Sequence, residues 1–297
     1  MRYNYTARMK VVCVLADTKW SIGRVHTDIA EALKGEYEFV FHHDSAFYVD
    51  AFRADFKRCD VFLTTPNLLG DIQHFLKGED LNKCLMIVHY HHANGWAFLR
   101  ESPLLSTLTY CTISEAATRS FPAPVLWTPS GINPAFFEHT PRSGVIKTLG
   151  WCGNLAWTSK RVDWSYKIAE KAELAVSLAV RIPFADMPAW YKSIDVLLVT
   201  SGPEEHRETG PLPPFEAVLS GVLVIGTAVG NVQLLPGPKF STIEEAAALL
   251  KDLQKSPDTV KALAKEQYEA VLAKWTIAAV LPTWRAALEA AAAKGRA

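Results

Sequence analysis

Two glutamates, Glu208 and Glu216, have seven residues between them and flank a bend that is rich in glycine and proline. After the bend comes a short apolar run that ends at Gly221. Proline fits the first turn of a helix, where its missing N–H costs nothing, and glycine fits the left-handed residue just past a helix end. We therefore predict a loop followed by a two-turn helix. The N-terminus of such a helix offers backbone N–H groups and the positive end of its dipole to a phosphate.

The two carboxylates would flank this anion site. Either could be an ordinary surface acid in a loop or on a helix. Glu216, however, stands among apolar residues at 214–219, where an unpaired carboxylate would be costly. A buried carboxylate needs a hydrogen-bond donor, and sugar hydroxyls are good donors.

The elements that must position these residues are indicated by apolar runs of strand length. Such runs are typical of parallel strands buried on both faces. In the first half they lie at 10–16, 37–41, 61–64, 85–90, 108–113 and 125–128, and in the second half at 145–152, 175–182, 194–200 and 222–226. Helix-compatible segments separate them, at 25–34, 163–171 and 188–193 among others, and 242–297 is predicted to be helical. Both halves therefore predict doubly wound α/β domains.

In such sheets, ligands bind beyond the carboxyl ends of the strands. Gly23 is predicted to lie in a turn after the first strand, His89 ends the strand at 85–90, and Asn154 follows the strand at 145–152. Together with the loop at 208–216, these residues could face one cleft between the domains. The basic pair Lys160 and Arg161 is either a solvated helix start or a partner for a diphosphate.

The histidine cluster at 89–92 invites a metal hypothesis. No carboxylate or cysteine stands nearby at a supporting spacing, so we favour one histidine, His89, as a hydrogen-bonding group for a polar ligand, and we expect no metal site. Gly23 is a lone glycine, and the fingerprint G-x-G-x-x-G is absent from the chain. This absence argues against a nicotinamide or flavin enzyme.

Composition indicates a soluble protein without a basic domain. The 31 basic and 31 acidic residues balance, and the first 140 residues hold 13 basic and 15 acidic ones, so nothing favours nucleic acid as a partner. Five widely spaced cysteines indicate free thiols of a reducing compartment. No signal peptide and no apolar run long enough for a membrane span are evident, so we expect a cytoplasmic protein.

The segment 194–235 resembles the donor-binding domain of family 4 retaining glycosyltransferases. The resemblance rests on Asp195, on Glu208 and Glu216 at their spacing, and on the glycines Gly221 and Gly230. It extends more weakly along the chain, through Gly23, through Val88 and His89, and through 130–133. It implies the GT-B architecture, in which two Rossmann-like domains face each other across a cleft.

The resemblance also implies an activity: transfer of a sugar from a nucleotide donor to a hydroxyl acceptor with retention, and without a cofactor or an essential metal. Lys160 would neutralise the donor diphosphate and Glu216 would accept from the ribose hydroxyls. Glu208 would hold the donor sugar, His89 would bind it from the other domain, and Gly23 would lie close to the diphosphate. The leaving phosphate would itself take the acceptor proton.

The chain departs from the family pattern at two places. An arginine that often follows the first strand of the second domain is missing, and Arg161 is a candidate replacement beside Asn154. The usual glycine before Leu212 is Pro211, which has no N–H, so Gly210 is a candidate for its role at the phosphate together with Leu212.

The expected domains are an acceptor-side domain at 1–136, a donor-binding domain at 145–274 and a helix at 275–297 that crosses back. Two alternatives remain beside the glycosyltransferase: a sugar-nucleotide isomerase or hydrolase of the same fold, and a non-catalytic nucleotide-sugar-binding module. Among acceptors, a lipid-linked glycan, a small molecule and a modified base in DNA all remain open. The DNA base would favour a basic first domain, which the charge count does not support.

Overall fold

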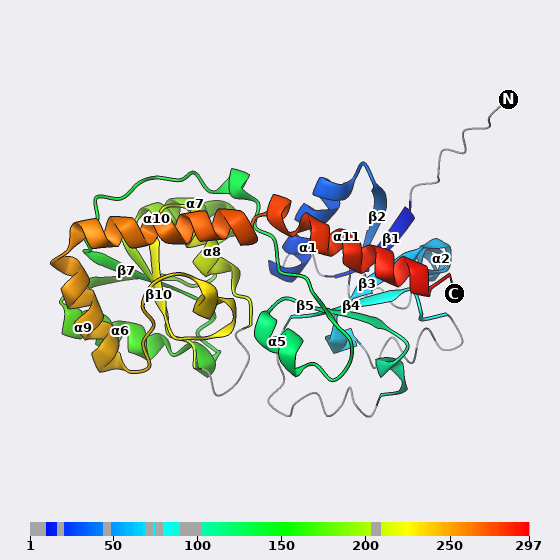
Figure 1. Ribbon diagram of the computed structural model, residues 1–297, viewed down its shortest axis with the longest axis horizontal. Coiled ribbons are helices and arrows are strands. Elements are labelled where there is room, and N and C mark those ends of the chain that lie inside the picture. The colour runs from blue at the N-terminus through cyan, green and yellow to red at the C-terminus, as the bar shows by residue number, and fades with distance from the viewer. Residues whose placement is uncertain are drawn as a thin grey trace.

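The computed structural model consists of two α/β lobes that lie side by side (Figure 1). It describes residues 10–16, 21–43, 49–68, 74, 76, 80–89, 102–202 and 209–296. Glu208 and the histidines at 91 and 92 lie outside these residues.

The first lobe is built on a six-stranded parallel sheet with the order β2-β1-β3-β4-β5-β6. Its strands are β1 (Lys10–Leu15), β2 (Tyr37–His42), β3 (Val61–Thr64), β4 (Cys84–Val88), β5 (Thr109–Thr112) and β6 (Leu126–Trp127). Each one coincides with a run that we predicted as a strand. The prediction is confirmed because side chains of a central parallel strand are buried on both faces, which requires a continuous apolar run.

Alternate side chains of these strands serve two separate cores. Val12 and Val14 pack with one apolar cluster, which includes α1 (Ser21–Leu33) and α11 (Ile277–Lys294). Val11 and Cys13 pack with the other cluster, which includes α2 (Asp50–Arg58) and α5 (Glu115–Ser120). Because successive side chains of a strand point to opposite faces, helices cover both sides of the sheet.

The second lobe has a four-stranded parallel sheet with the order β10-β9-β7-β8. Its strands are β7 (Thr148–Cys152), β8 (Ala175–Ala179), β9 (Val196–Val199) and β10 (Leu223–Gly226). Its helices are α6 (Val162–Ala172), α7 (Met187–Lys192), α8 (Leu212–Leu219), α9 (Ile243–Gln254) and α10 (Pro257–Lys274). Counted within the lobe, its strands follow the same order as the first four strands of the other sheet.

Two chain crossings join the lobes, and they are hydrogen-bonded to each other. The amide of Ile132 donates to the carbonyl of Trp275 at 2.8 Å, and the amide of Ile277 donates back to Ile132 at 2.9 Å. In Figure 1, α10 runs along the second lobe and α11 continues from it across the first. The ring of Trp275 stacks on Phe215 of α8 with centroids 4.9 Å apart, so one apolar cluster continues through both lobes.

Two further expectations are tested by the fold. All five cysteines are free, as predicted.

The predicted turn at Gly23 is wrong, because α1 begins at Ser21 and includes Gly23 in its first turn. Glycine disfavours a helix interior by only about 1 kcal/mol, and the apolar contacts of Val25, Ile29 and Leu33 on the same helix outweigh that cost. Among the described residues, no helix has the length and apolar character needed to cross a bilayer.

Candidate functional site

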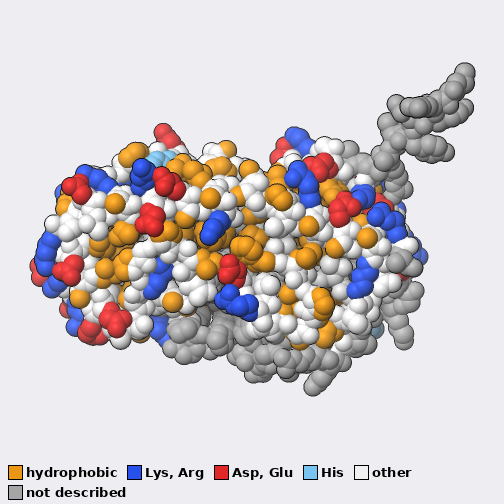
Figure 2. All heavy atoms as spheres, in the orientation of Figure 1, with side chains coloured by type: hydrophobic (Ala, Val, Ile, Leu, Met, Phe, Trp, Pro, Cys, Tyr) orange, Lys and Arg blue, Asp and Glu red, His pale blue; other side chains and the backbone are white. Residues whose placement is uncertain are grey.

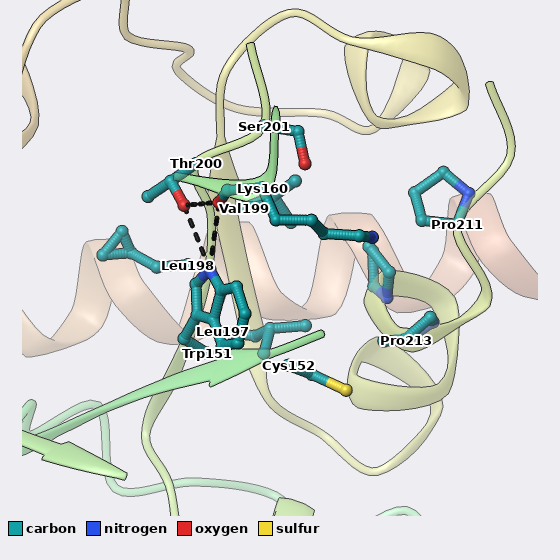
Figure 3. Close-up of a pocket in the computed structure, with 11 residues that line it drawn as sticks. Trp151, Cys152, Lys160, Leu197, Leu198, Val199, Thr200, Ser201, Pro211 and Pro213 are labelled. Carbon is teal, nitrogen blue, oxygen red and sulfur yellow. Dashed lines mark hydrogen bonds between the residues drawn. The ribbon is translucent and has the colours of Figure 1, made fainter. Parts of the chain in front are cut away.

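The candidate site lies where the direction of winding of the second sheet reverses. Strands β7 and β9 are neighbours there, and in doubly wound sheets ligands occupy the crevice at the carboxyl ends of such a pair. A narrow pocket opens at this place, lined by Trp151 and Cys152 of β7 and by Thr200 and Ser201 after β9 (Figure 3). The start of α8 closes its opposite side. The expected cleft position in this lobe is therefore a real concavity.

Lys160 brings a positive charge into this pocket. It ends a short 3₁₀ turn, and its backbone carbonyl accepts from the Trp151 indole at 3.2 Å and from the Thr200 hydroxyl at 2.7 Å. These bonds tie the lysine backbone to the ends of β7 and β9. Figure 3 shows the side chain extending across the pocket toward Pro211 and Pro213. An ammonium group thus faces the N-terminus of α8, where the helix dipole is positive and favours an anion.

The prolines limit which backbone donors α8 can offer. Pro211 is the N-cap and Pro213 and Pro214 stand in the first turn, and none of them has an N–H. Between residues 210 and 214, only Gly210 and Leu212 carry a backbone N–H. The predicted end of this helix is confirmed, since Gly221 adopts a left-handed φ of 83° just beyond it.

Glu216 is buried in α8 and is held by two protein donors. The guanidinium of Arg24, from the first turn of α1 in the other lobe, pairs with Oε1. The hydroxyl of Tyr191 in α7 donates to Oε2 at 2.8 Å. Burial raises the pKa of the Glu216 carboxyl, and the Arg24 charge and the Tyr191 hydrogen bond counteract part of that rise. The donors that we expected from sugar hydroxyls are thus supplied in the structure by the chain itself.

His89 follows β4 and is buried at the contact between the lobes. Its carbonyl accepts a hydrogen bond from the hydroxyl of Thr209 in the second lobe. Its ring lies 5.8 Å from that of His26 of α1, centroid to centroid. Burial lowers the pKa of His89 to about 3, with a further contribution from His26, so the ring is neutral at neutral pH. A neutral imidazole can donate to a sugar hydroxyl or accept from one.

Gly210 lies directly against the first lobe. A β-carbon at this position would come within 2.7 Å of the Ile113 side chain, which follows β5. The side-chain amide of Asn231 donates to the Ile113 carbonyl at 2.9 Å, and the Asn231 backbone donates to Thr209 at 2.7 Å. The loop before α8 is therefore docked on the carboxyl ends of β4 and β5. The carboxyl-end edges of the two sheets, at which ligands of such folds bind, therefore face each other.

The remaining predicted residues lie around this centre. Arg161 has a left-handed φ of 46° at the start of α6, and its guanidinium lies 4.6 Å from the ring centroid of Trp164. Asn154 is exposed, and its side chain accepts from the Ala156 amide at 3.0 Å. Leu212 is buried in the first turn of α8.

Sequence reasoning missed Arg24, Tyr191, Thr209 and Asn231. Arg24 directly follows Gly23, but its contact with Glu216 spans 192 positions and nothing in the local pattern indicates it. Thr209 stands between two residues that we had singled out. Its proximity to a predicted phosphate-binding loop was the one available signal.

A larger cavity, of about 590 Å³, lies elsewhere in the second lobe. It is lined by α10 and by residues close to the amino ends of the strands, such as Asp195 and Leu223. Ligands of doubly wound folds bind at the opposite edge. We therefore assign the candidate site to the narrower pocket beside Lys160, and among the described residues no group of three acidic, histidine or cysteine side chains could hold a metal.

Comparison with known proteins agrees with this architecture. Residues 139–286 match the Glycosyl transferase-like family. The structure of HepE from Anabaena in complex with UDP-glucose is similar over 95% of this chain and 99% of that chain, with a TM-score of 0.70 and 13% identity. The catalytic domain of starch synthase IV from Arabidopsis thaliana, bound to ADP and acarbose, covers 96% of this chain and 99% of its own, with a TM-score of 0.64 and 10% identity.

A third structure, of AviGT4, a glycosyltransferase involved in avilamycin A biosynthesis, covers 95% of this chain and 98% of its own at a TM-score of 0.61 and 12% identity. None of the curated protein sequences compared with the chain matches it. At these identities the solved structures show the fold, which is GT-B: two Rossmann-like lobes with facing ligand edges. The family match over residues 139–286 and the GT-B fold of the whole chain together support a glycosyltransferase enzyme.

Proposed function

We propose that the protein transfers a sugar from a nucleoside diphosphate donor to a hydroxyl acceptor, with retention at the anomeric carbon. The observation that carries the proposal is the Lys160 side chain facing the start of α8, with Glu216 one turn further along the same helix. The ligands bound in two similar structures, UDP-glucose in HepE and ADP in starch synthase IV, support the donor class.

Cleavage of the bond between sugar and diphosphate leaves negative charge on the diphosphate oxygens. In the proposal, the Lys160 ammonium, the N–H groups of Gly210 and Leu212 and the dipole of α8 stabilise that charge. Preorganised donors of this kind stabilise a transition state at little reorganisation cost. In this proposal protein cations do the work of a metal, and the leaving oxygen takes the acceptor proton.

The other residues take positions around the donor. Glu216 accepts from the ribose hydroxyls, and Glu208, outside the described residues, holds the hydroxyls of the transferred sugar. His89 contacts that sugar from the first lobe, as a neutral hydrogen-bonding group. Gly23 at the start of α1 lies by the diphosphate, with Asn154 and Arg161 at the rim.

A panel of uridine, guanosine and adenosine diphosphate sugars tests the proposal by slow donor hydrolysis. We expect one donor to release its nucleoside diphosphate, with a rate that EDTA does not change, and we expect NMR of the fresh product to show the anomer of the donor. An inverted anomer would exclude retention, and loss of turnover with EDTA would exclude the metal-free mechanism. Candidate acceptors that never accelerate turnover would indicate a hydrolase.

Lys160→Ala should lower turnover about 100-fold, which is the usual effect of removing one transition-state donor. Lys167→Ala is the matched control, because Lys167 is exposed on α6 and pairs with Asp163 at 3.1 Å. Equal rates in the two variants would contradict the role of Lys160.

A further inference from the structure

The contact between Arg24 and Glu216 joins the two lobes at the point where the donor is proposed to bind. Arg24 reaches across from α1, and its guanidinium carbon lies 3.7 Å from the ring centroid of Phe184 in the second lobe. Beside it, Tyr191 of α7 donates the second hydrogen bond to the Glu216 carboxylate. The guanidinium of Arg24 therefore contacts both an anion and an aromatic face of the second lobe.

The exposures of the two partners differ, and the difference shows how Glu216 can be reached. The side chain of Glu216 is 4% exposed, whereas that of Arg24 is 23% exposed. Tyr191 is buried on the other side of the carboxylate. A molecule that arrives from solvent therefore meets the guanidinium before it meets the carboxylate. A ligand that binds Oε1 from this side therefore displaces Arg24.

Displacing Arg24 has a cost, because the buried carboxylate of Glu216 would lose its paired cation. A ligand that enters here must supply hydroxyl donors to Glu216 and an anion to Arg24. Neutral sugars supply only the first group and inorganic phosphate only the second. A nucleoside diphosphate supplies both, because its ribose carries two hydroxyls and its diphosphate begins a few bonds away.

We propose that Arg24 is a donor-binding residue that competes with the donor ribose for Glu216 and, once displaced, pairs with the diphosphate. The inference rests on the proposed function, because it takes the ribose to bind Glu216. In the exchange no covalent bond forms or breaks: Glu216 exchanges a guanidinium for two hydroxyls, and Arg24 exchanges a carboxylate for a diphosphate oxygen. The lobes separate at this contact when the donor enters and are rejoined through the donor itself.

The test compares the affinity of a nucleoside with that of its diphosphate, measured by calorimetry with uridine and UDP, guanosine and GDP, and adenosine and ADP. In Arg24→Gln the nucleoside should bind more tightly than in the unaltered protein, because its competitor is gone. The advantage of the diphosphate over the nucleoside should fall about tenfold, the value of one charge-assisted hydrogen bond. Equal losses for nucleoside and diphosphate would overturn the exchange and reduce Arg24 to a residue that orients Glu216.

Arg285→Gln is the matched control, since Arg285 forms a bidentate pair with Glu36 outside the site. It should leave both affinities unchanged. If Arg24→Gln does not fold, Arg24→Lys decides: it keeps the charge beside Glu216 but loses the guanidinium fork, so the diphosphate advantage should fall about threefold. An unchanged advantage in folded Arg24→Lys overturns the inference. An unaltered protein that binds none of the diphosphates would instead contradict the proposed function itself.

Discussion

The carboxylate of Glu216 receives one charged and one neutral donor, and the neutral one is the more deeply buried. Tyr191 is fully buried, and its hydroxyl has Glu216 as its partner at 2.8 Å. Burial, followed by the charge of Glu216, raises the pKa of the Tyr191 hydroxyl well above its usual value, so it remains a donor throughout the physiological range. Its role is to satisfy a lone pair that water cannot reach.

Tyr191→Phe should therefore lower the free energy of unfolding by about 1–3 kcal/mol, the cost of leaving a buried acceptor unsatisfied. Urea denaturation at neutral pH measures the change. Tyr110→Phe is the matched control, because Tyr110 is equally buried but donates to the Leu104 carbonyl over a long 3.3 Å. Equal losses in the two variants would show that Glu216 does not depend on its neutral donor.

A second residue-scale feature is the buried pair of His26 and His89. Neither ring nitrogen of His26 has a hydrogen-bond partner among the described residues, and its ring also lies 5.9 Å from that of Trp284. Burial lowers the pKa of His26 to about 4. In the unfolded chain a histidine titrates near 6.5, so the unfolded state binds protons first as the pH falls. The contribution of neutral His26 to the free energy of unfolding is therefore complete above about pH 6.5 and is lost progressively as the pH falls toward about 4.

His26→Phe should remove part of this pH dependence, because phenylalanine has a ring but does not titrate. Between pH 7 and pH 5, protonation linked to His26 alone should lower the free energy of unfolding of the unaltered protein by about 2 kcal/mol. The free energy of unfolding of the variant should fall by about 2 kcal/mol less over the same range. Denaturation at the two pH values measures the difference. His42→Phe is the control, because His42 bonds to Asp55 at 2.9 Å and is not left without a partner. An identical pH dependence in His26→Phe would contradict the assignment.

At the scale of elements, the strands were predictable and the contacts between elements were not. Each strand of both sheets overlaps a predicted apolar run, and the runs are clearest for strands such as β3, β4, β9 and β10, which are buried along their whole length. The start of α8 was also predictable, because the N–H that proline lacks is not needed in the first turn of a helix. Its end was predictable from Gly221. Gly23 was misplaced because the same glycine that favours a turn is tolerated in a helix held by its apolar face. The Arg24 partner of Glu216 depends on how the lobes dock, which no local pattern contains.

Gly221→Ala should test the end of α8. Residue 221 has a φ of 83°, and a methyl group there would collide with the carbonyl of Thr140. Gly237→Ala is the matched control, since its φ is 97° but its nearest neighbour, Leu263, is 3.5 Å away. We expect about 1–2 kcal/mol of destabilisation from backbone strain in the control and a larger loss in Gly221→Ala. Thermal melts measure both, and equal losses would show that the collision is relieved by a shift of the chain.

At the scale of the whole molecule, the candidate site combines a pocket of the second lobe with residues of the first lobe that contact its surroundings. The cation at Lys160 and the start of α8 belong to the second lobe, whereas Arg24 and His89 belong to the first. Figure 2 shows acidic and basic side chains interspersed over both lobes on the face that it displays. Among the described residues of this face no side chains of one sign form a continuous field that would favour a polyanion, which agrees with the balanced charge of the sequence.

Two buried amides separate stability within a lobe from the docking of the lobes. Asn231 carries its hydrogen bond across the interface, to the Ile113 carbonyl, whereas Gln267 bonds to both the amide and the carbonyl of Val224 within the second lobe. Asn231→Ala should leave the Ile113 carbonyl without that partner at a cost of about 1 kcal/mol. We expect this cost to weaken the docking of the two lobes on each other rather than the packing within a lobe. Small-angle scattering should then show a larger radius of gyration with little change in the urea midpoint. Gln267→Ala should do the reverse, lowering the midpoint while the radius of gyration stays the same. If both variants lower the midpoint and leave the radius unchanged, the lobes are held together by their shared apolar cluster, and the polar contacts at the site do not control its opening.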